Sequence, residues 1–343
     1  MSPAPTRRQL QIGLGLLWVL DAVLQCQSEM FTPDFYGNML MMNMAAPPAW
    51  LWRLITDIEP TVVNHSFAVN VVAIVIQFAS GLGLLWRRTA PWSLALSIPW
   101  AVIVWLFGEM GGGLFVEGGS ALTGAPGAAL VYAVLALLLW PRRPDNGSAA
   151  ADAGLLPRPA PSLAWMALWV GTAFLEGGYL NRSPMYAAQA MDNAALTGPG
   201  WLHSSGQAVG GLVGTDGGLF ALCAGVVQAV VGLGILWPRT RRAALVAGGG
   251  LALFYAVVGQ AFGGVFSNGL GIMGSGATDP GTGPVVILLA LALWPRRPVP
   301  TRFRALPRAR FLRTSGLGEE PFTVAPAEGA LPEDSSAGLT GRR

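Results

Sequence analysis

The sequence predicts an all-α polytopic membrane protein whose eight transmembrane helices form two parallel four-helix repeats. Three observations predict this fold class: an apolar composition, arginine clusters between apolar runs, and a pattern that recurs after 151 residues. Of the 343 residues, 52% are hydrophobic and 11% are charged, whereas about a quarter are charged in a soluble globular protein. This composition excludes an ordinary soluble enzyme, a disordered chain and a disulfide scaffold.

A membrane-spanning helix needs about 20 mostly apolar residues. Eight runs have this character: 11–28, 65–86, 91–110, 122–140, 162–180, 217–237, 243–264 and 283–295. The last run is short, and its helix can begin earlier, in the Gly-rich stretch before it. The first run follows Arg7 and Arg8, as in a signal peptide, but Asp21 interrupts it and no small-residue cleavage site follows. We therefore interpret it as a retained helix.

The basic residues indicate the orientation. All 21 are Arg, and their clusters precede the first run, follow the eighth and lie between the second and third, fourth and fifth, and sixth and seventh runs. By the positive-inside rule, this pattern predicts a multi-pass protein of the plasma (inner) membrane with both termini cytoplasmic. Arginines placed beside apolar runs favour a topology signal over a nucleic-acid-binding stripe. The expected partner is therefore the lipid bilayer, with no nucleic acid.

The two halves of the chain resemble each other. Residues 77–88 match residues 228–239 with seven identities in twelve positions, and 139–144 match 293–298. The predicted domains are a first repeat (1–145), a cytoplasmic linker (146–161), a second repeat (162–298) and a disordered cytoplasmic tail (299–343). Because each repeat has an even number of helices, the repeats are expected to be parallel, with their axis along the membrane normal. Gly81 and Gly232 are expected to allow close helix packing.

Polar residues recur inside the apolar runs. A charged residue at a helix centre in the membrane costs about 2.5–3.5 kcal/mol on insertion scales. We predict one central polar site that could share a proton or bind a cation. The alternative is interhelical hydrogen bonding that only holds the bundle together. The predicted site contains Asp21, Gln25 and Gln77 from the first repeat and their counterparts Thr172, Glu176 and Gln228 from the second.

A glycine-rich segment ends the third helix of each repeat. Glu109 begins the first segment and Gln260 the second, and glycines follow both. We predict that each helix ends here in a tight turn. The alternative is that the backbone amides bind an anion.

The outer loop after the first run is rich in methionine. Met39 and Met42 lie here, and His65 follows, so thioether and imidazole ligands would suit Cu(I). We favour an amphipathic helix on the outer leaflet, with copper as the alternative. The only two cysteines, Cys26 and Cys223, form no metal-binding spacing.

A four-helix unit with a polar residue in its first helix and glycine-rich helix ends resembles the DoxX/DoxD-like membrane proteins, here in tandem duplication. Residues 17–33 are also similar to uncharacterised actinobacterial membrane proteins. The DoxX resemblance implies small helical bundles, some linked to quinone-dependent redox complexes such as thiosulfate:quinone oxidoreductase. No catalytic residue carries over to this chain.

We predict a non-enzymatic carrier or an accessory subunit of a redox or envelope assembly, which would supply a protein partner. No cofactor is evident. The alternatives are a DoxX-like, quinone-linked redox subunit and copper handling at the outer face. The quinone-linked reading needs a redox partner, because the chain has no haem histidine pairs, flavin fingerprint or cluster cysteines.

Overall fold

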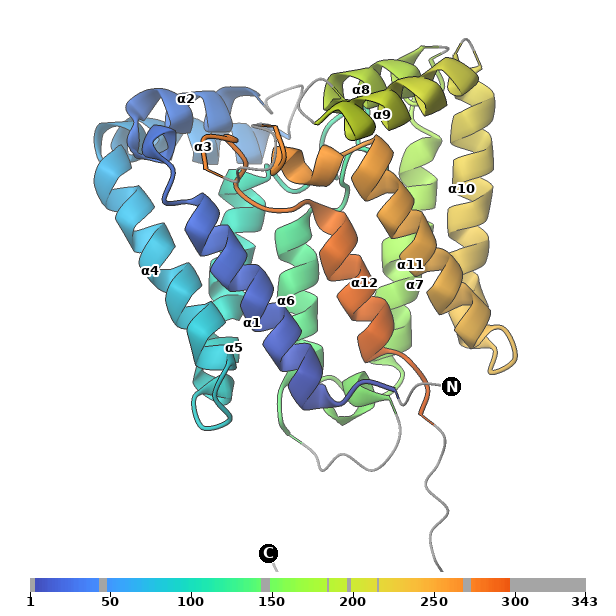
Figure 1. Ribbon diagram of the computed structural model, residues 1–343, viewed down its shortest axis with the longest axis horizontal. Helices are drawn as coiled ribbons and strands as arrows, with labels where there is room; N and C mark the ends of the chain where they lie inside the picture. The colour runs from blue at the N-terminus through green and yellow to red at the C-terminus, as the bar shows by residue number, and fades with distance from the viewer. Residues whose placement is uncertain are drawn as a thin grey trace, which may run out of the picture. The chain divides into compact units, whose positions relative to one another are not determined.

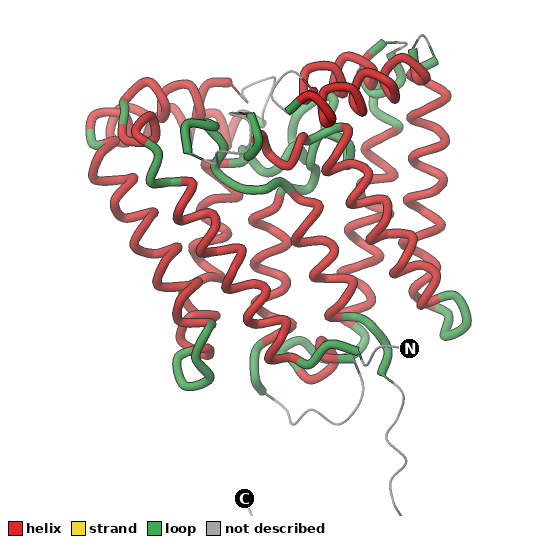
Figure 2. Tube along the Cα trace, in the orientation of Figure 1, coloured by secondary structure: helices red, strands yellow, loops and turns green. Residues whose placement is uncertain are grey.

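The computed structural model describes residues 4–42, 48–142, 149–183, 185–195, 199–214, 216–267 and 273–296. These residues form helices and connecting loops, with no strand among them (Figure 2). The all-α fold class is therefore confirmed. The predicted tail (299–343) and the first three residues of the predicted linker (146–148) lie outside the described residues.

The first half of the chain, residues 7–139, places two short helices after its first long one. Its elements are α1 (Arg7–Leu24), η1 (Ser28–Phe31), α2 (Pro33–Met42), α3 (Ala49–Asn64), α4 (Ser66–Leu84), α5 (Ala90–Ile103), η2 (Val104–Gly108) and α6 (Ala128–Leu139). The segment η2 is a π-helical turn that prolongs α5. The short helices α2 and α3 lie across one end of the long helices (Figure 1).

The second half, residues 160–292, has the same order of long and short helices. Its elements are α7 (Ala160–Glu176), α8 (Tyr186–Ala195), α9 (Gly200–Val213), α10 (Gly217–Leu233), η4 (Gly234–Leu236), α11 (Arg241–Val258), η5 (Ala261–Gly264) and α12 (Thr282–Ala292). The turn η3 (Ala150–Ala153) precedes it. Helices α8 and α9 lie across the same end as α2 and α3, and α6 packs against α12 (Figure 1).

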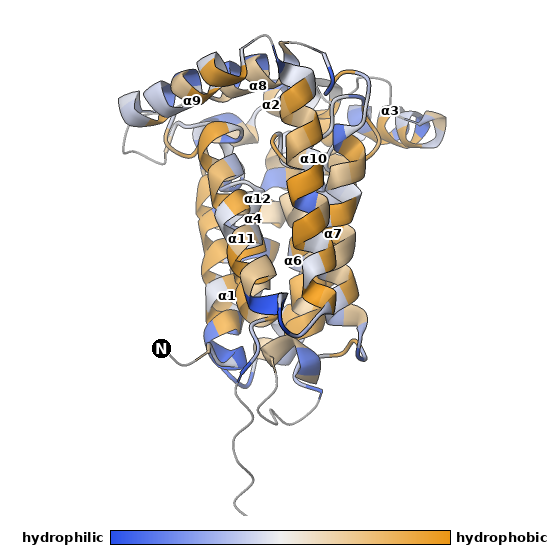
Figure 3. Ribbon diagram, turned by 90° about the vertical axis from the view of Figure 1, so that its right-hand side faces the viewer, coloured by the Kyte–Doolittle hydropathy of each residue, from blue (hydrophilic) through white to orange (hydrophobic). Residues whose placement is uncertain are grey.

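Four helical segments of the described chain are long and apolar enough to cross a membrane. They are Ser66–Leu84, Ala90–Gly108, Gly217–Leu236 and Arg241–Val258. Helices α6 and α12 are apolar but shorter. The apolar character of the long helices is visible along their length, in contrast to the more polar ends (Figure 3).

Helix α4 has its polar side buried and its apolar side exposed. Its buried positions include Ser66, Asn70, Gln77 and Ser80, whereas Phe67, Val71, Val72, Val75 and Leu82 are exposed. A helix of a soluble protein has the opposite pattern. Polar groups that face the bundle and apolar groups that face outward are typical of a helix surrounded by lipid.

Glycines permit two close helix crossings. A Cβ atom on Gly81 of α4 would lie 2.8 Å from the carbonyl oxygen of Gly15 in α1, and a Cβ on Gly15 would lie 2.8 Å from that of Gly81. At the crossing of α10 with α7, a Cβ on Gly232 would lie 2.9 Å from Val170 Cγ2. The close packing expected at Gly81 and Gly232 is confirmed.

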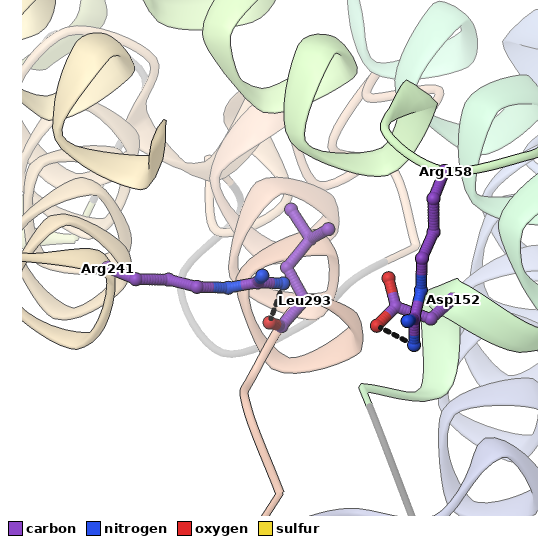
Figure 4. Close-up of polar contacts among 4 residues, drawn as sticks. All are labelled: Asp152, Arg158, Arg241 and Leu293. Atoms are coloured by element: carbon purple, nitrogen blue, oxygen red, sulfur yellow. Dashed lines mark hydrogen bonds and ion pairs between the residues drawn. The ribbon is translucent and has the colours of Figure 1, made fainter. Parts of the chain in front are cut away.

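Arginines cap helix ends on the side opposite the short helices. Arg241 donates to the carbonyl oxygen of Leu293 at 2.9 Å, and Arg158 pairs with Asp152 at 2.9 Å (Figure 4). Arg8 donates to the carbonyl oxygens of Leu84 and Leu85. The last carbonyl groups of a helix lack intrahelical partners, and the guanidinium groups of Arg8 and Arg241 satisfy them at the ends of α4 and α12. Arg8 and Arg241 thus have a structural role besides any effect on topology.

Candidate functional site

The candidate site is a cavity of about 700 Å³. Helices α1, α4, α5 and α6 surround it, α2 and α3 contribute part of its lining, and the loop before α12 reaches it. Most of its lining is apolar. The polar or polar-tipped side chains that line it include Trp18, Asp21, Gln25, Gln77, Trp100, Glu109, Tyr132 and Asp279.

Seven buried polar atoms on this lining have no hydrogen-bond partner among the described residues. A buried polar group without a partner costs about 1–3 kcal/mol, and native proteins keep few of them. Their concentration on one cavity therefore identifies a place where a bound molecule would supply the missing partners. The atoms are Trp18 Nε1, Asp21 Oδ1, Gln25 Oε1, Gln77 Oε1, Trp100 Nε1, Glu109 Oε2 and Tyr132 Oη.

The side chains at the centre of the lining are almost fully buried. The exposed fraction is 4% for Asp21, 4% for Gln77 and 3% for Tyr132. Asp21 and Gln25 stand one turn apart at the end of α1, and Gln77 lies on the buried polar face of α4. Tyr132 comes from α6, and its hydroxyl group lies near the Asp21 carboxylate but outside hydrogen-bond geometry. Three helices thus direct polar groups into one apolar space.

Helix α2 is held over the cavity by polar contacts to α4. The hydroxyl group of Tyr36 donates to Asn70 Oδ1 at 3.3 Å, and Asn70 Nδ2 donates to the carbonyl oxygen of Gln25 at 2.9 Å. Leu40 of α2 packs against Leu51 and Ile55 of α3. Part of the apolar face of α2 therefore meets protein.

Glu109 and Gln260 cap the last helix of each half. Glu109 Oε1 accepts from the backbone N–H of Ala129 at 2.9 Å, in the first turn of α6. Gln260 Oε1 accepts from the backbone N–H of Thr282 at 2.9 Å, at the start of α12. These contacts satisfy amide groups that a helix start leaves without partners.

The tight turns expected from the sequence are present directly after Glu109 and Gln260. Residues 110–113 and 261–264 all have positive φ angles, from 46° to 78°, so each segment is a left-handed turn that glycine tolerates best. The amides of Gly111 and Gly112 donate to the carbonyl oxygens of Trp105 and Glu109, both at 2.7 Å. Because they already have partners, these two amides are not available to an anion.

A second cavity, here called the vestibule, has a volume of about 660 Å³. It lies between the segment 109–128, helix α8 and the segment 259–282. Glu109, Ala128 and Asp279 line both the vestibule and the first cavity. These residues therefore form the boundary between the two spaces.

Two carboxyl groups at this boundary, those of Glu109 and Asp279, have raised pKa values. Burial, and then the negative charge of Asp279, raise the pKa of Glu109 to about 8, against the lowering effect of the amides of Ala129 and Ala128. Burial also raises the pKa of Asp279, although Gly281 N and the Thr278 hydroxyl group donate to its carboxylate at 2.7 and 3.2 Å. With its pKa raised to about 8, the carboxyl group of Glu109 is mostly protonated at neutral pH.

The corresponding polar residues of the second half form a closed cluster. Gln228 Nε2 donates to Glu176 Oε1 at 3.0 Å and to the hydroxyl oxygen of Tyr255 at 2.9 Å. The Thr172 hydroxyl group donates within its own helix, to Leu168 O at 3.0 Å. The pocket that Thr172 and Tyr255 line is small, about 20 Å³.

The six residues of the predicted central site therefore divide into two groups. Asp21, Gln25 and Gln77 line the large cavity, whereas Thr172, Glu176 and Gln228 do not. The single site expected from the sequence is not assembled, because α1 packs with α4 and α7 packs with α10 as separate pairs. Each pair keeps its own polar residues.

Several cavity residues were not predicted from the sequence. Trp18, Trp100 and Tyr132 occur in apolar runs, where their rings look like ordinary packing residues. Asp279 lies in a loop, outside the apolar runs in which a polar group stands out. The one available signal was Tyr132, the only side chain with a hydrogen-bonding group in α6.

The copper alternative stays a prediction. Met39 lines the large cavity, but His65 is exposed at the junction of α3 and α4, where its Nδ1 lies 2.9 Å from the carbonyl oxygen of Thr61. The side chain of Met42 lies outside the described residues. Among the described residues, no group of three or more His, Cys, Asp or Glu side chains could hold a metal ion.

Comparison with known protein families, curated proteins and solved structures finds no match to this chain.

Proposed function

We propose that the protein is an integral membrane protein that binds one small, largely apolar molecule with a polar head group in the large cavity. It would act as a non-enzymatic carrier or as an accessory subunit of a redox or envelope assembly. One observation carries this proposal: seven buried polar atoms without hydrogen-bond partners among the described residues line a single, largely apolar cavity of about 700 Å³. Ligand pockets for small molecules have this size and this mixture of groups.

The surroundings of the cavity favour a ligand that comes from the bilayer. Val72 of α4 and Ile103 of α5 line the cavity, yet they are 52% and 46% exposed. The lining thus extends to the apolar outer surface between these two helices. A lipid-soluble molecule would reach the polar groups from this side without crossing water.

We further propose eight spans, arranged as two parallel four-helix repeats in the plasma membrane with both termini cytoplasmic. The recurrence of left-handed turns at 110–113 and 261–264, and of the caps Glu109 and Gln260, supports the repeat. The helices α1, α4, α5 and α6, with α7, α10, α11 and α12, would be the spans. The short helices would then lie at the outer face.

A quinone is a second candidate ligand, and the resemblance to DoxX-like proteins would give it a redox context. The indole N–H groups of Trp18 and Trp100 and the hydroxyl group of Tyr132 line the cavity and have no hydrogen-bond partner in the described part of the chain. Carbonyl oxygens on an apolar ring system would accept hydrogen bonds from them.

The test uses one substitution on two faces of the same helical segment. Val104 lines the cavity, whereas Val102 is 38% exposed and does not. Val104→Tyr should fill the cavity, and Val102→Tyr is the matched control. Wild type and both variants are purified in native lipid discs, and their bound small molecules are extracted and quantified by mass spectrometry.

We expect one molecule to be enriched with the wild type and with Val102→Tyr, and to be lost from Val104→Tyr. Equal amounts of every extracted molecule in all three samples would contradict the proposal. Thermal unfolding of the three proteins identifies a loss that reflects misfolding.

A further inference from the structure

The lining of the large cavity carries acidic groups and no basic ones. Asp21, Glu109 and Asp279 contribute carboxylates, and no Arg, Lys or His occurs among the described residues that line it. The vestibule adds Glu117 and likewise has no basic residue in its described lining. The chain has 21 arginines, yet none of the described arginines lines either cavity. The fold therefore keeps the acidic groups of the cavities apart from the basic residues.

Aromatic rings surround these carboxylates. Trp18 and Tyr132 pack edge to face, with ring centroids 4.6 Å apart and an interplanar angle of 65°. The cavity lining also includes Phe35, Tyr36, Trp100 and Phe107. The faces of Trp, Tyr and Phe attract cations, and the attraction is larger where water is excluded.

The carboxylates are not neutralised by the protein. Asp21 is 4% exposed, and its Oδ1 atom has no hydrogen-bond partner among the described residues; the same holds for Glu109 Oε2. In a low-dielectric site an acidic group must be protonated or paired with a positive charge. A cation in the cavity would provide that charge, and an apolar body would fill the remaining space.

We propose that the ligand of this cavity is a hydrophobic organic cation, with a quaternary or protonated nitrogen on an aromatic or alkyl body, that exchanges with a proton held by Glu109 or Asp21. The inference rests on the proposed binding function and adds the chemical class of the ligand. The exchange balances in charge: one cation binds, one carboxyl group becomes a carboxylate, and one proton leaves. No covalent bond is made in the ligand.

The proton has a route that is separate from the apolar side of the cavity. Glu109 and Asp279 line the vestibule as well as the cavity, so a proton released from Glu109 can pass to the vestibule. The titratable groups that face Glu109 are Asp21 of α1, Tyr36 of α2, Tyr132 of α6 and Asp279 of the loop before α12, with Glu117 and Tyr186 at the vestibule. All are acids, so none supplies a positive charge in place of the ligand.

The exchange makes cation binding depend on pH. Since the pKa of Glu109 is raised to about 8, the carboxyl group is mostly protonated at pH 6 and mostly ionised at pH 9. A permanently charged ligand should therefore bind more tightly at the higher pH. Glu109→Gln has no carboxyl group at this position and should lose most of this dependence.

The experiment compares two probes of nearly the same shape. Benzyltrimethylammonium carries a permanent positive charge, and neopentylbenzene is its neutral carbon isostere. Binding of each to the wild type in lipid discs is measured by calorimetric titration at pH 6 and pH 9. We expect the cation to bind about tenfold more tightly than the isostere at pH 9. The reason is that only the cation is attracted by the aromatic rings and the carboxylates in a cavity that excludes water.

Three variants assign the effect to the site. Asp21→Asn should weaken cation binding by about tenfold at pH 9 and leave the isostere unchanged, because the amide keeps the shape but removes the charge. Glu109→Gln should flatten the pH dependence. Asp57→Asn, at an exposed residue of α3 that lines neither cavity, is the matched control and should behave as the wild type. If Asp21→Asn does not fold, Glu109→Gln alone carries the comparison.

Three outcomes would overturn the inference or part of it. If the isostere binds as tightly as the cation, the site takes neutral molecules, and the proposed binding function survives without this ligand class. If neither probe binds, the cation assignment fails; the extracted molecules of wild type and Val104→Tyr then decide separately whether the cavity binds any ligand. Cation binding that is the same at both pH values would overturn the proton exchange.

Discussion

Gln77 and Gln228 have the same chemistry, and the sequence places them at corresponding positions of α4 and α10, but their surroundings differ. Gln228 Nε2 donates to Glu176 and Tyr255, whereas Gln77 lines the cavity; the Oε1 atoms of both glutamines lack a hydrogen-bond partner among the described residues. At the same spacing of 151 residues, the counterpart of Tyr255 is Val104, which lines the cavity. A tyrosine closes one cluster, and a valine leaves the other open.

This difference predicts opposite effects of the same substitution. Gln228→Leu should lower the free energy of unfolding by about 1–3 kcal/mol, because it leaves the buried Glu176 and Tyr255 without their partner. Gln77→Leu should change it by less than about 0.5 kcal/mol or raise it, because it removes a polar atom that has no protein partner. Unfolding in mixed micelles measures both. A larger loss in Gln77→Leu than in Gln228→Leu would contradict the contrast.

At this scale the sequence predicts which polar residues are unusual but not how they are grouped. Asp21 and Gln77 could be predicted because polar groups are expensive in an apolar helix. Their separation from Glu176 depends on which helices pack together, and a periodic pattern does not contain that information. The roles of Trp18 and Tyr132 depend on the direction of one N–H or O–H group, which also becomes defined only in the folded protein.

Among the elements, α1 and α4 cross closely near the cavity. Gly15 and Gly81 bring the two backbones together, so that a Cβ atom on Gly81 would lie 2.7 Å from Val19 Cγ2 and 2.8 Å from the backbone nitrogen of Val19. Asp21, Gln25 and Gln77 lie between this crossing and the end of the bundle that carries the short helices. The crossing therefore sets the distance between the two polar walls of the cavity.

Gly81→Val should force these helices apart. Overpacking of this kind costs about 1–3 kcal/mol, and the shift should also weaken binding in the cavity. Gly250→Val in α11 is the matched control, since a Cβ at Gly250 meets nothing within 4 Å. Thermal unfolding in lipid discs should show a lower midpoint for Gly81→Val only. Equal midpoints would mean that α1 and α4 do not need this contact.

The long helices could be predicted well, and the short ones poorly. The run 217–237 was expected as a helix, and α10 with η4 occupies Gly217–Leu236. The run 122–140 begins its helix only at Ala128, because Gly124 and Gly127 have φ angles of 107° and 96°. Helices α8 and α9 were not expected, because they are short and rich in alanine, glycine and polar residues, and so lack the long apolar runs that predict the spans.

At the scale of the described chain, each half contacts a loop of the other. Gln27, after α1, donates to the carbonyl oxygen of Ala277 at 2.9 Å and accepts from the amide of Ser275 at 2.6 Å. Asn181, after α7, donates to the carbonyl oxygen of Gly119 at 3.0 Å. These contacts and the packing of α6 against α12 join the halves. Asp279 reaches the cavity of the first half from the second half's loop, so the site needs both.

The proposed orientation follows from the distribution of arginine between the two ends of the long helices. The loops 85–89 and 237–240 lie at the end where the chain begins, opposite the short helices (Figure 1). They contain Arg87, Arg88 and Arg239. A positive charge is held on the cytoplasmic side during insertion. The vestibule and the short helices would then face outward, which is the side to which Glu109 would release its proton.

Cysteine labelling tests this orientation in intact cells. Cys26 and Cys223 are free and exposed, so both are first replaced by Ser. Single cysteines at Asn38 and Ser204, on the exposed sides of α2 and α9, should then react with a membrane-impermeant maleimide. Cysteines at Arg88 and Arg239 should react only after the membrane is permeabilised, because the loops that carry them are proposed to be cytoplasmic. Labelling of either arginine position in intact cells, with Asn38 protected, would reverse the orientation and place the vestibule inside.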